Sequence, residues 1–170
     1  MIQGAKHEMS SLSGADKHEV SGTAPAVTGS SVVTLTIPCA AEYVGTARLT
    51  ILGVASRMGF SYDQVEDIRL AVGEACTNAI ARSEGMASHA PTITIRSHVE
   101  PTQLVVEIED TVANADGDAA DKDKTAGDEM NSAELGALLM EILVDEVTLE
   151  LRPYGTHVRL TKYATLGTTS

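Results

Sequence analysis

Cysteine is scarce in this sequence, whose 170 residues include only Cys39 and Cys76. No apolar run is long enough to span a bilayer and no secretory leader is recognisable, so we expect a reduced, cytoplasmic protein without a membrane anchor. Neither cysteine suits a metal site. Cys76 falls on the apolar side of a predicted helix and is expected in the core rather than as a nucleophile. A chain of this length fits one domain with one core.

Basic side chains are also few. The sequence has 12 lysines and arginines against 24 aspartates and glutamates, which gives a formal charge of -12. Such a charge repels a nucleic-acid backbone and an anionic membrane, so direct binding to either is not expected. It is compatible with a basic protein partner, such as a DNA-binding transcription factor, although many soluble proteins are acidic for solubility alone.

Regular patterning is missing from three segments. Residues 1–30 are rich in serine, glycine, alanine and threonine and predict a disordered arm, while residues 165–170 predict a flexible tail. Residues 111–133 consist largely of aspartate, alanine, glycine and lysine, and so long a stretch inside a compact domain indicates either disorder or a functional lid. We therefore expect a single domain over residues 31–164.

The rest of the sequence changes between strand and helix patterns. Apolar residues recur either at every second position or at helical spacing, and turn residues separate the segments. The expected strands are 32–37, 92–99, 104–110, 147–151 and 158–161, and the expected helices are 42–58, the stretch after Ser61, and 135–144. This order predicts an α/β (α+β) fold, a two-layer sandwich of a mixed, mainly antiparallel sheet with helices on one face.

The second helix has the clearest pattern. Ser61 and Gln64 predict a capping box at its start. Its apolar stripe comprises Val65, Ile68, Val72, Ala75, Cys76 and Ala79, and a second stripe comprises Asp67, Ala71, Glu74 and Asn78. Glu74 and Asn78 are four residues apart and therefore point the same way. Spacing alone favours a solvated polar face there, and a nucleotide site is the alternative.

Eight short motifs occur in a fixed order along the chain. They are EYVG at 42–45, RLT at 48–50, GVAS at 53–56, EACTNA at 74–79, LME at 139–141, DEV at 145–147, GT at 155–156 and TKY at 161–163. In sequence and order these motifs resemble the RsbW family of anti-sigma factors and serine-protein kinases, in the GHKL (Bergerat-fold) ATPase superfamily. The match runs from about Val33 to Tyr163. Such collinearity is more specific than any single motif.

The resemblance implies a Bergerat-type ATP-binding fold with an ATP lid at residues 111–133. By the resemblance, Asn78 coordinates the Mg²⁺ that bridges the triphosphate, and Glu74 is the catalytic residue that polarises the attacking serine hydroxyl. These roles suit the residues, because Mg²⁺ takes oxygen ligands and a carboxylate can accept a hydroxyl proton. The resemblance therefore implies ATP and Mg²⁺ as cofactors.

Three further residues receive nucleotide-binding roles from the resemblance. Asp110 corresponds to the family's adenine-reading aspartate, Thr156 to a threonine near the adenine, and Gly136 to the one glycine retained from the phosphate-binding segment before the third helix. On their own, Asp110 is equally well a turn aspartate, and a glycine followed by Thr156 indicates no more than a turn entering a strand.

The resemblance also implies protein partners. It predicts a homodimer that sequesters a stress-response sigma factor and phosphorylates a serine of an anti-anti-sigma antagonist. Arg48, a cation on the first helix within a matched motif, is our candidate for a partner contact. A solvated helix position is equally plausible for it.

The sequence departs from the family pattern at three places. Val112 stands where the family has a glycine after its adenine-reading aspartate, and Gly136 is the only glycine of its segment. The histidine that commonly follows the asparagine motif is absent, since the segment there is Ala81-Arg82-Ser83. These departures raise a second hypothesis, a non-catalytic binding module with weak or lost nucleotide binding. His89, His98 and His157 lack metal-ligand spacing, so no metal beyond Mg²⁺ is expected.

Overall fold

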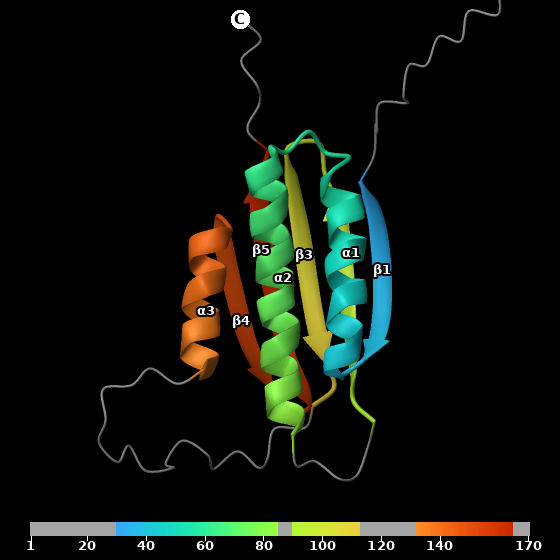
Figure 1. The fold of residues 1–170 in the computed structure, drawn as a ribbon, viewed down its shortest axis with the longest axis vertical. Helices are drawn as coiled ribbons and strands as arrows, with labels where there is room; N and C mark the ends of the chain where they lie inside the picture. The colour runs from blue at the N-terminus through green and yellow to red at the C-terminus, as the bar shows by residue number, and fades with distance from the viewer. Residues whose placement is uncertain (1–29, 85–89, 113–131, 165–170) are drawn as a thin grey trace, which may run out of the picture.

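The computed structural model describes residues 30–84, 90–112 and 132–164. Most of the expected N-terminal arm, residues 113–131 of the expected lid, the expected tail and His89 lie outside the described residues. In chain order the elements are β1 (Ser31–Pro38), a short 3-10 helix (Ala41–Tyr43), α1 (Val44–Ala55), α2 (Tyr62–Ser83), β2 (Thr92–Val99), β3 (Gln103–Asp110), α3 (Ser132–Leu143), β4 (Glu146–Arg152) and β5 (Gly155–Tyr163) (Figure 1).

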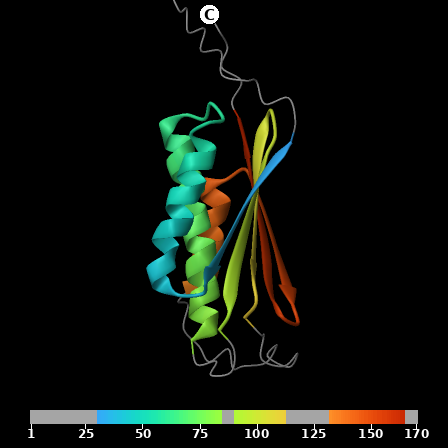
Figure 2. The ribbon, with the colours of Figure 1, turned by 90° about the vertical axis from the view of Figure 1, so that its right-hand side faces the viewer.

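The strands form one five-stranded sheet in the order β1-β2-β3-β5-β4. All neighbouring strands pair antiparallel, so the described part of the sheet is wholly antiparallel rather than mixed. The three helices lie side by side on one face of the sheet (Figures 1 and 2). The predicted two-layer α+β sandwich with helices on one face is therefore confirmed.

The core lies between this sheet face and the helices. Antiparallel register places Ile95 opposite Ile108, and alternate residues are buried over 92–97 and over 106–110 because side chains alternate between the two faces. The predicted apolar stripe of α2 is buried as expected. Ala71, which we placed on the polar stripe, is 0% exposed. The reason is that α2 is the middle helix and packs against α1 and α3 as well as the sheet.

Element ends differ slightly from the predicted ones. The predicted capping box is present, since Gln64 N–H donates to Ser61 Oγ at 3.2 Å and Ser61 N–H donates to Gln64 Oε1 at 3.0 Å. The first helix is shorter than expected at both ends, and Gly59 takes a φ of 74° in the turn that follows. Helix α3 starts at Ser132 rather than Leu135, so Gly136 lies inside the helix.

The other face of the sheet carries paired charges. Each pair joins side chains from different strands, so the pairs tie β2, β3, β4 and β5 together across the face. They are Arg96–Glu109, Arg152–Glu109, Arg159–Glu107 and His98–Glu107. His98 and His157 are strand residues as expected, and each lies near a glutamate. No helix in the described part of the chain is long and apolar enough to cross a membrane.

Candidate functional site

Glu74 and Asn78 lie on α2 and are both partly buried. One turn separates them, so they share the side of the helix predicted from the sequence. Within the described residues neither side chain has a hydrogen bond or an ion pair. A carboxylate and a carboxamide that are partly buried and unpaired are available to a ligand.

Asn78 lies directly against Gly136 of α3. A Cβ built on Gly136 would stand 2.6 Å from Asn78 Nδ2 and 2.9 Å from Oδ1. Gly136 is buried, and only hydrogen at its Cα leaves space for the carboxamide. The structure thus brings these two predicted site residues together, and Gly136 meets Asn78 from within α3 rather than from a loop before it.

Asp110 ends β3, as predicted, and its side chain is 4% exposed. Its Oδ1 accepts the Val112 N–H at 3.1 Å, and its Oδ2 accepts a hydrogen bond from Nη2 of Arg82, in the last turn of α2. The sequence did not predict this ion pair, whose partners are 28 positions apart. Val112 is 1% exposed and belongs to the packed interior.

Gly155 and Thr156 begin β5 beside Asp110. Gly155 has a φ of 112°, and a Cβ on it would lie 1.8 Å from the carbonyl oxygen of Asp110. Only glycine fits this close approach without a shift of the backbone. Thr156 is 2% exposed, and its hydroxyl is buried with no hydrogen-bond partner within the described residues. The ends of β3 and β5 therefore bring the predicted adenine-binding residues Asp110 and Thr156 near each other.

Apart from Glu74, which lies near the middle of α2, these residues lie toward one end of the molecule. The C-terminal end of α2, the end of β3, the start of β5 and the start of α3 all lie at the lower end in Figure 1. The sheet order makes this possible because β3 and β5 are antiparallel neighbours, so the end of one lies beside the start of the other. In sequence the same residues span from Glu74 to Thr156.

The two cysteines are unsuited to nucleophilic chemistry. Burial raises the pKa of Cys76 to about 12, and Cys76 is 0% exposed, which confirms its place in the core. Burial also raises the pKa of Cys39, which lies near Arg82 and Asp110. A thiol is a nucleophile only as thiolate, so neither group is reactive at neutral pH.

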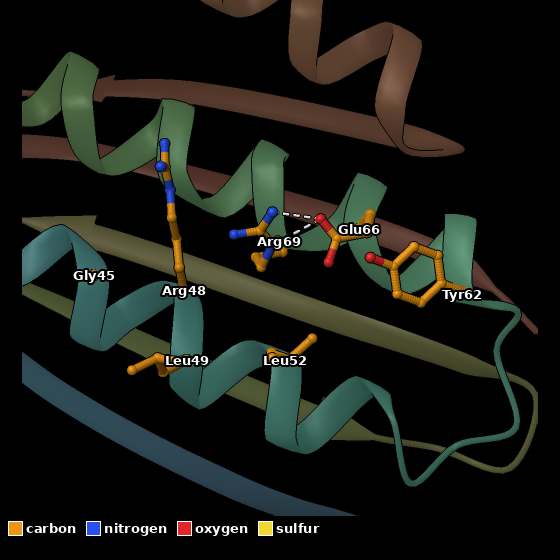
Figure 3. A pocket seen from close by; sticks show the side chains of 7 residues that line it. All are labelled: Gly45, Arg48, Leu49, Leu52, Tyr62, Glu66 and Arg69. Atoms are coloured by element: carbon orange, nitrogen blue, oxygen red, sulfur yellow. Dashed lines mark hydrogen bonds and ion pairs between the residues drawn. The ribbon is translucent and has the colours of Figure 1, made fainter.

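Arg48 does not extend into solvent. Its guanidinium lies across Gly73 on α2, where a Cβ would come 2.3 Å from Nε and 2.6 Å from Nη2. Nε is buried without a hydrogen-bond partner in the described part of the chain. Figure 3 shows the side chain reaching from α1 toward α2. Arg48 is therefore a half-buried bridge between the two helices.

Arg48 also lines a groove between α1 and α2, with a volume of about 530 Å³. The groove, which we call the α1–α2 groove, is lined by Gly45, Arg48, Leu49, Leu52, Tyr62, Glu66 and Arg69 (Figure 3). Leu49 is 69% exposed and Tyr62 is 78% exposed. We did not predict this groove. The large apolar residues outside the predicted core positions, such as Leu49 and Tyr62, could have indicated it in the sequence.

The model of the histidine kinase-like ATPase domain family matches residues 37–162, most of the chain. This chain belongs to the family of RsbW-type serine-protein kinases, within the histidine kinase-like (GHKL) ATPases. The serine-protein kinase RsbW of Bacillus licheniformis is 37% identical over 134 residues, covering 74% of this chain and 81% of that protein. RsbW of Bacillus subtilis is 37% identical over 137 residues, which cover 77% of this chain and 84% of that protein. RsbW of Staphylococcus aureus is 34% identical over 138 residues, which cover 77% of this chain and 86% of that protein.

A solved structure agrees with the fold. The crystal structure of the RsbU and RsbW domains of Rv1364c from Mycobacterium tuberculosis matches with a TM-score of 0.59 at 15% identity, covering 79% of this chain and 33% of that one. At this identity the likeness concerns the fold alone. The RsbW-type resemblance seen in the sequence motifs is confirmed by the family model and by the relatives.

Proposed function

We propose that this RsbW-type protein sequesters a stress-response sigma factor and uses Mg-ATP to phosphorylate a serine of an anti-anti-sigma antagonist. Phosphorylation would change which partner the protein holds, so sigma factor and antagonist exchange. The observation that carries the proposal is that the end of β3, which holds Asp110, and the start of β5, which holds Thr156, lie at the same end of the fold as the C-terminal half of α2, which holds Asn78. The relatives of the chain are serine-protein kinases.

The residues around Asp110 fit an adenine. A buried carboxylate accepts hydrogen bonds, and the exocyclic amine of adenine donates them. The Thr156 hydroxyl is buried and has no hydrogen-bond partner among the described residues, and such a group is unfavourable unless something bonds to it. Gly155 lets the start of β5 approach the Asp110 backbone closely, which keeps Thr156 near the end of β3. We assign the base to this corner of the proposed site.

Asn78 and Glu74 would serve the phosphate end. The Asn78 oxygen is a suitable ligand for Mg²⁺, which otherwise relies on phosphates and water. When bound, Mg-ATP supplies the phosphoryl group and a cation that offsets charge developing during transfer. Glu74 would accept the hydroxyl proton of the substrate serine while the serine oxygen bonds to the γ-phosphorus. The bond between the γ-phosphorus and the oxygen that bridges to the β-phosphate would break in the same transfer. Gly136 holds α3 close enough to fix the Asn78 carboxamide.

The α1–α2 groove is the proposed protein-docking surface. Arg48 offers a cation next to the exposed Leu49, and the exposed Tyr62 lies farther along the groove, which suits a partner with an acidic group and apolar side chains. The overall charge of -12 favours a basic partner surface around it. We further propose, from the resemblance alone, that the protein forms a homodimer and acts in the cytoplasm, where sigma factors work.

A second function has support from one observation. Asp110 is already bonded to Arg82, and Val112 fills space at the end of β3, so a non-catalytic sigma-binding module without nucleotide binding is the alternative. Calorimetric titration of the full chain with ATP and Mg²⁺ distinguishes the two. The proposed kinase binds in the micromolar range, and Asn78→Ala weakens that binding. Absent binding, or a Kd above about 1 mM, supports the module instead.

Gln103→Ala is the matched control for this titration. Gln103 also carries a carboxamide, but it starts β3 at the opposite end of the strand from Asp110, where it bonds to Glu100. Its replacement should leave nucleotide affinity unchanged. A similar loss in both variants would show that Asn78→Ala acts through general destabilisation rather than through the proposed site.

A further inference from the structure

Arg82 holds the carboxylate that the proposed nucleotide site would use to read adenine. Its Nη2 donates to Oδ2 of Asp110, while the backbone N–H of Val112 occupies Oδ1 at 3.1 Å. The Asp110 side chain is 4% exposed, whereas that of Arg82 is 29% exposed. Because the carboxylate is nearly fully buried and Oδ2 already accepts one hydrogen bond, a new donor at Oδ2 competes with the guanidinium.

Displacing the guanidinium is eased because one of its N–H groups lacks a hydrogen bond among the described residues. Arg82 Nε is buried and has no hydrogen-bond partner within the described residues. Arg82 lies in the last turn of α2, and its side chain is the more exposed member of the pair. A ligand that displaces Arg82 from Asp110 releases it toward solvent, where all of its N–H groups can be hydrated.

The surroundings of Asp110 do not offer the amine another carboxylate oxygen. Gly155 packs against the Asp110 backbone so closely that a Cβ on residue 155 would lie 1.8 Å from the Asp110 carbonyl oxygen. Val112 and Thr156 are 1% and 2% exposed. Thr156 contributes a hydroxyl without a partner, which adds a hydrogen-bonding group but no charge. Of the described groups that donate to Asp110, Val112 uses its backbone and Arg82 its side chain, so Arg82 is the one that a ligand would displace.

We propose that Arg82 is a specificity-determining residue of the nucleotide site, which competes with the adenine exocyclic amine for Oδ2 of Asp110. The inference rests on the proposed function, because Asp110 is the adenine-reading group only there. Breaking the ion pair reduces the net gain from the amine contact, so this chain discriminates weakly between a purine with the amine and one without it. Removing the guanidinium should restore that discrimination.

The test compares ATP with purine riboside triphosphate, which lacks the exocyclic amine, by calorimetric titration of the full chain with Mg²⁺. In Arg82→Ala the ratio of the two affinities should rise about three- to tenfold in favour of ATP, the range of one net hydrogen bond. Arg82→Gln, which keeps a hydrogen-bond donor without the charge, should show a smaller rise. Arg82→Ala leaves the buried Asp110 carboxylate without its charged partner and can therefore unfold the protein. In that case Arg82→Gln is the variant that tests the proposal.

A double-mutant cycle shows whether Arg82 acts through Asp110. In the Asp110→Ala background, Arg82→Ala should leave the ATP-to-analogue ratio unchanged, because both carboxylate oxygens are gone. Arg159→Ala is the matched control, since Arg159 also pairs with a glutamate of β3, Glu107, on the opposite face of the sheet. That variant should leave the ratio as in the unmodified protein.

The outcomes separate the inference from the proposed function. If the unmodified protein binds ATP but Arg82→Ala lowers or leaves unchanged its preference over the analogue, Arg82 is no competitor and the inference fails while the kinase proposal stands. An equal loss for both nucleotides would show that Arg82 attracts the triphosphate, which also overturns the inference. If neither the unmodified protein nor any Arg82 variant binds ATP, both proposals fail.

Discussion

The carboxamide of Asn78 packs against the bare Cα of Gly136, where a Cβ would lie 2.6 Å from Nδ2. This contact connects α2 with α3 at the residue proposed to hold Mg²⁺. It gives Gly136 a definite structural role, since the fixed position of the carboxamide depends on the absence of a side chain on α3.

Gly136→Ala should weaken Mg-ATP binding about tenfold or more, because the added methyl displaces the Asn78 carboxamide. Calorimetric titration measures this. The control is Gly53→Ala, another helical glycine, at which a Cβ meets nothing within 4 Å. That change should stabilise α1 by about 0.5–1 kcal/mol and leave nucleotide affinity unchanged. Equal affinity of Gly136→Ala and the unmodified protein for Mg-ATP would show that Gly136 has no role in the nucleotide site.

Gly73→Ala should weaken binding of the protein partner by displacing Arg48. A Cβ at residue 73 would come 2.3 Å from Arg48 Nε, and a flexible arginine can yield by leaving its place in the α1–α2 groove. The expected loss in surface-plasmon titrations against sigma factor or antagonist is about fivefold to a hundredfold. Arg48→Ala should give a comparable loss, and the two changes should not add.

Arg57→Ala is the charge-matched control for Arg48→Ala. Arg57 follows α1 in an exposed turn and has no ion pair within the described residues. Its replacement should leave partner affinity within about twofold, the range of an exposed charge. Additive losses from Gly73→Ala and Arg48→Ala would contradict the proposal that Gly73 acts through Arg48.

Gly155→Ala should destabilise the fold more than Gly59→Ala. Both glycines have positive φ, 112° and 74°, but a Cβ on Gly155 would lie 1.8 Å from the Asp110 carbonyl oxygen, whereas Gly59 has open space. The strain alone is about 1–2 kcal/mol for Gly59→Ala, and Gly155→Ala adds a steric clash to it. Urea unfolding gives both free energies. Equal losses would mean that β5 does not approach Asp110 this closely.

The ion pairs on the open sheet face predict a pH dependence of stability. The hydrogen bond from Arg96, opposed by partial burial and aided by Arg152, lowers the pKa of Glu109. A carboxyl group with a lowered folded pKa contributes stability above its unfolded pKa, about 4.3, and that contribution is lost as the pH falls through the folded pKa. Arg96→Met should therefore cost about 0.2–1 kcal/mol at neutral pH and nothing once Glu109 is protonated.

Thermal unfolding of Arg96→Met across the acid range measures this dependence. The difference in stability from the unmodified protein should shrink steadily as the pH falls below the unfolded pKa of Glu109. Arg57→Met controls for the loss of one positive charge without an ion pair in the described residues. A difference between Arg96→Met and the unmodified protein that persists at low pH would mean that Arg96 stabilises the sheet by packing rather than by its pairing with Glu109.

Local patterns predicted most of the fold. The five strands and three helices appear in the expected order, and the capping box at Ser61 and Gln64 forms. The patterns failed where a neighbouring element decides the environment. Ala71 is buried because α2 lies between two other helices, and nothing in its own helix indicates that.

The site was predictable only in part. The spacing of Glu74 and Asn78 places them on one side of α2, but the packing of Gly136 on Asn78 and of Arg48 on Gly73 depends on how helices pack together. The Arg82–Asp110 pair joins residues 28 positions apart, and the approach of Gly155 to Asp110 requires β5 to lie beside β3. Single-sequence periodicity carries no information on such contacts between elements.

Transfer of labelled phosphate from ATP to a serine of the anti-anti-sigma protein tests the central claim most directly. The unmodified chain with Mg²⁺ should transfer phosphate, while Glu74→Gln and Asn78→Ala should reduce the rate by at least about a hundredfold. Glu141→Gln, an exposed acid on α3, should retain the full rate. No transfer by the unmodified chain, or full transfer by Asn78→Ala, would contradict the account.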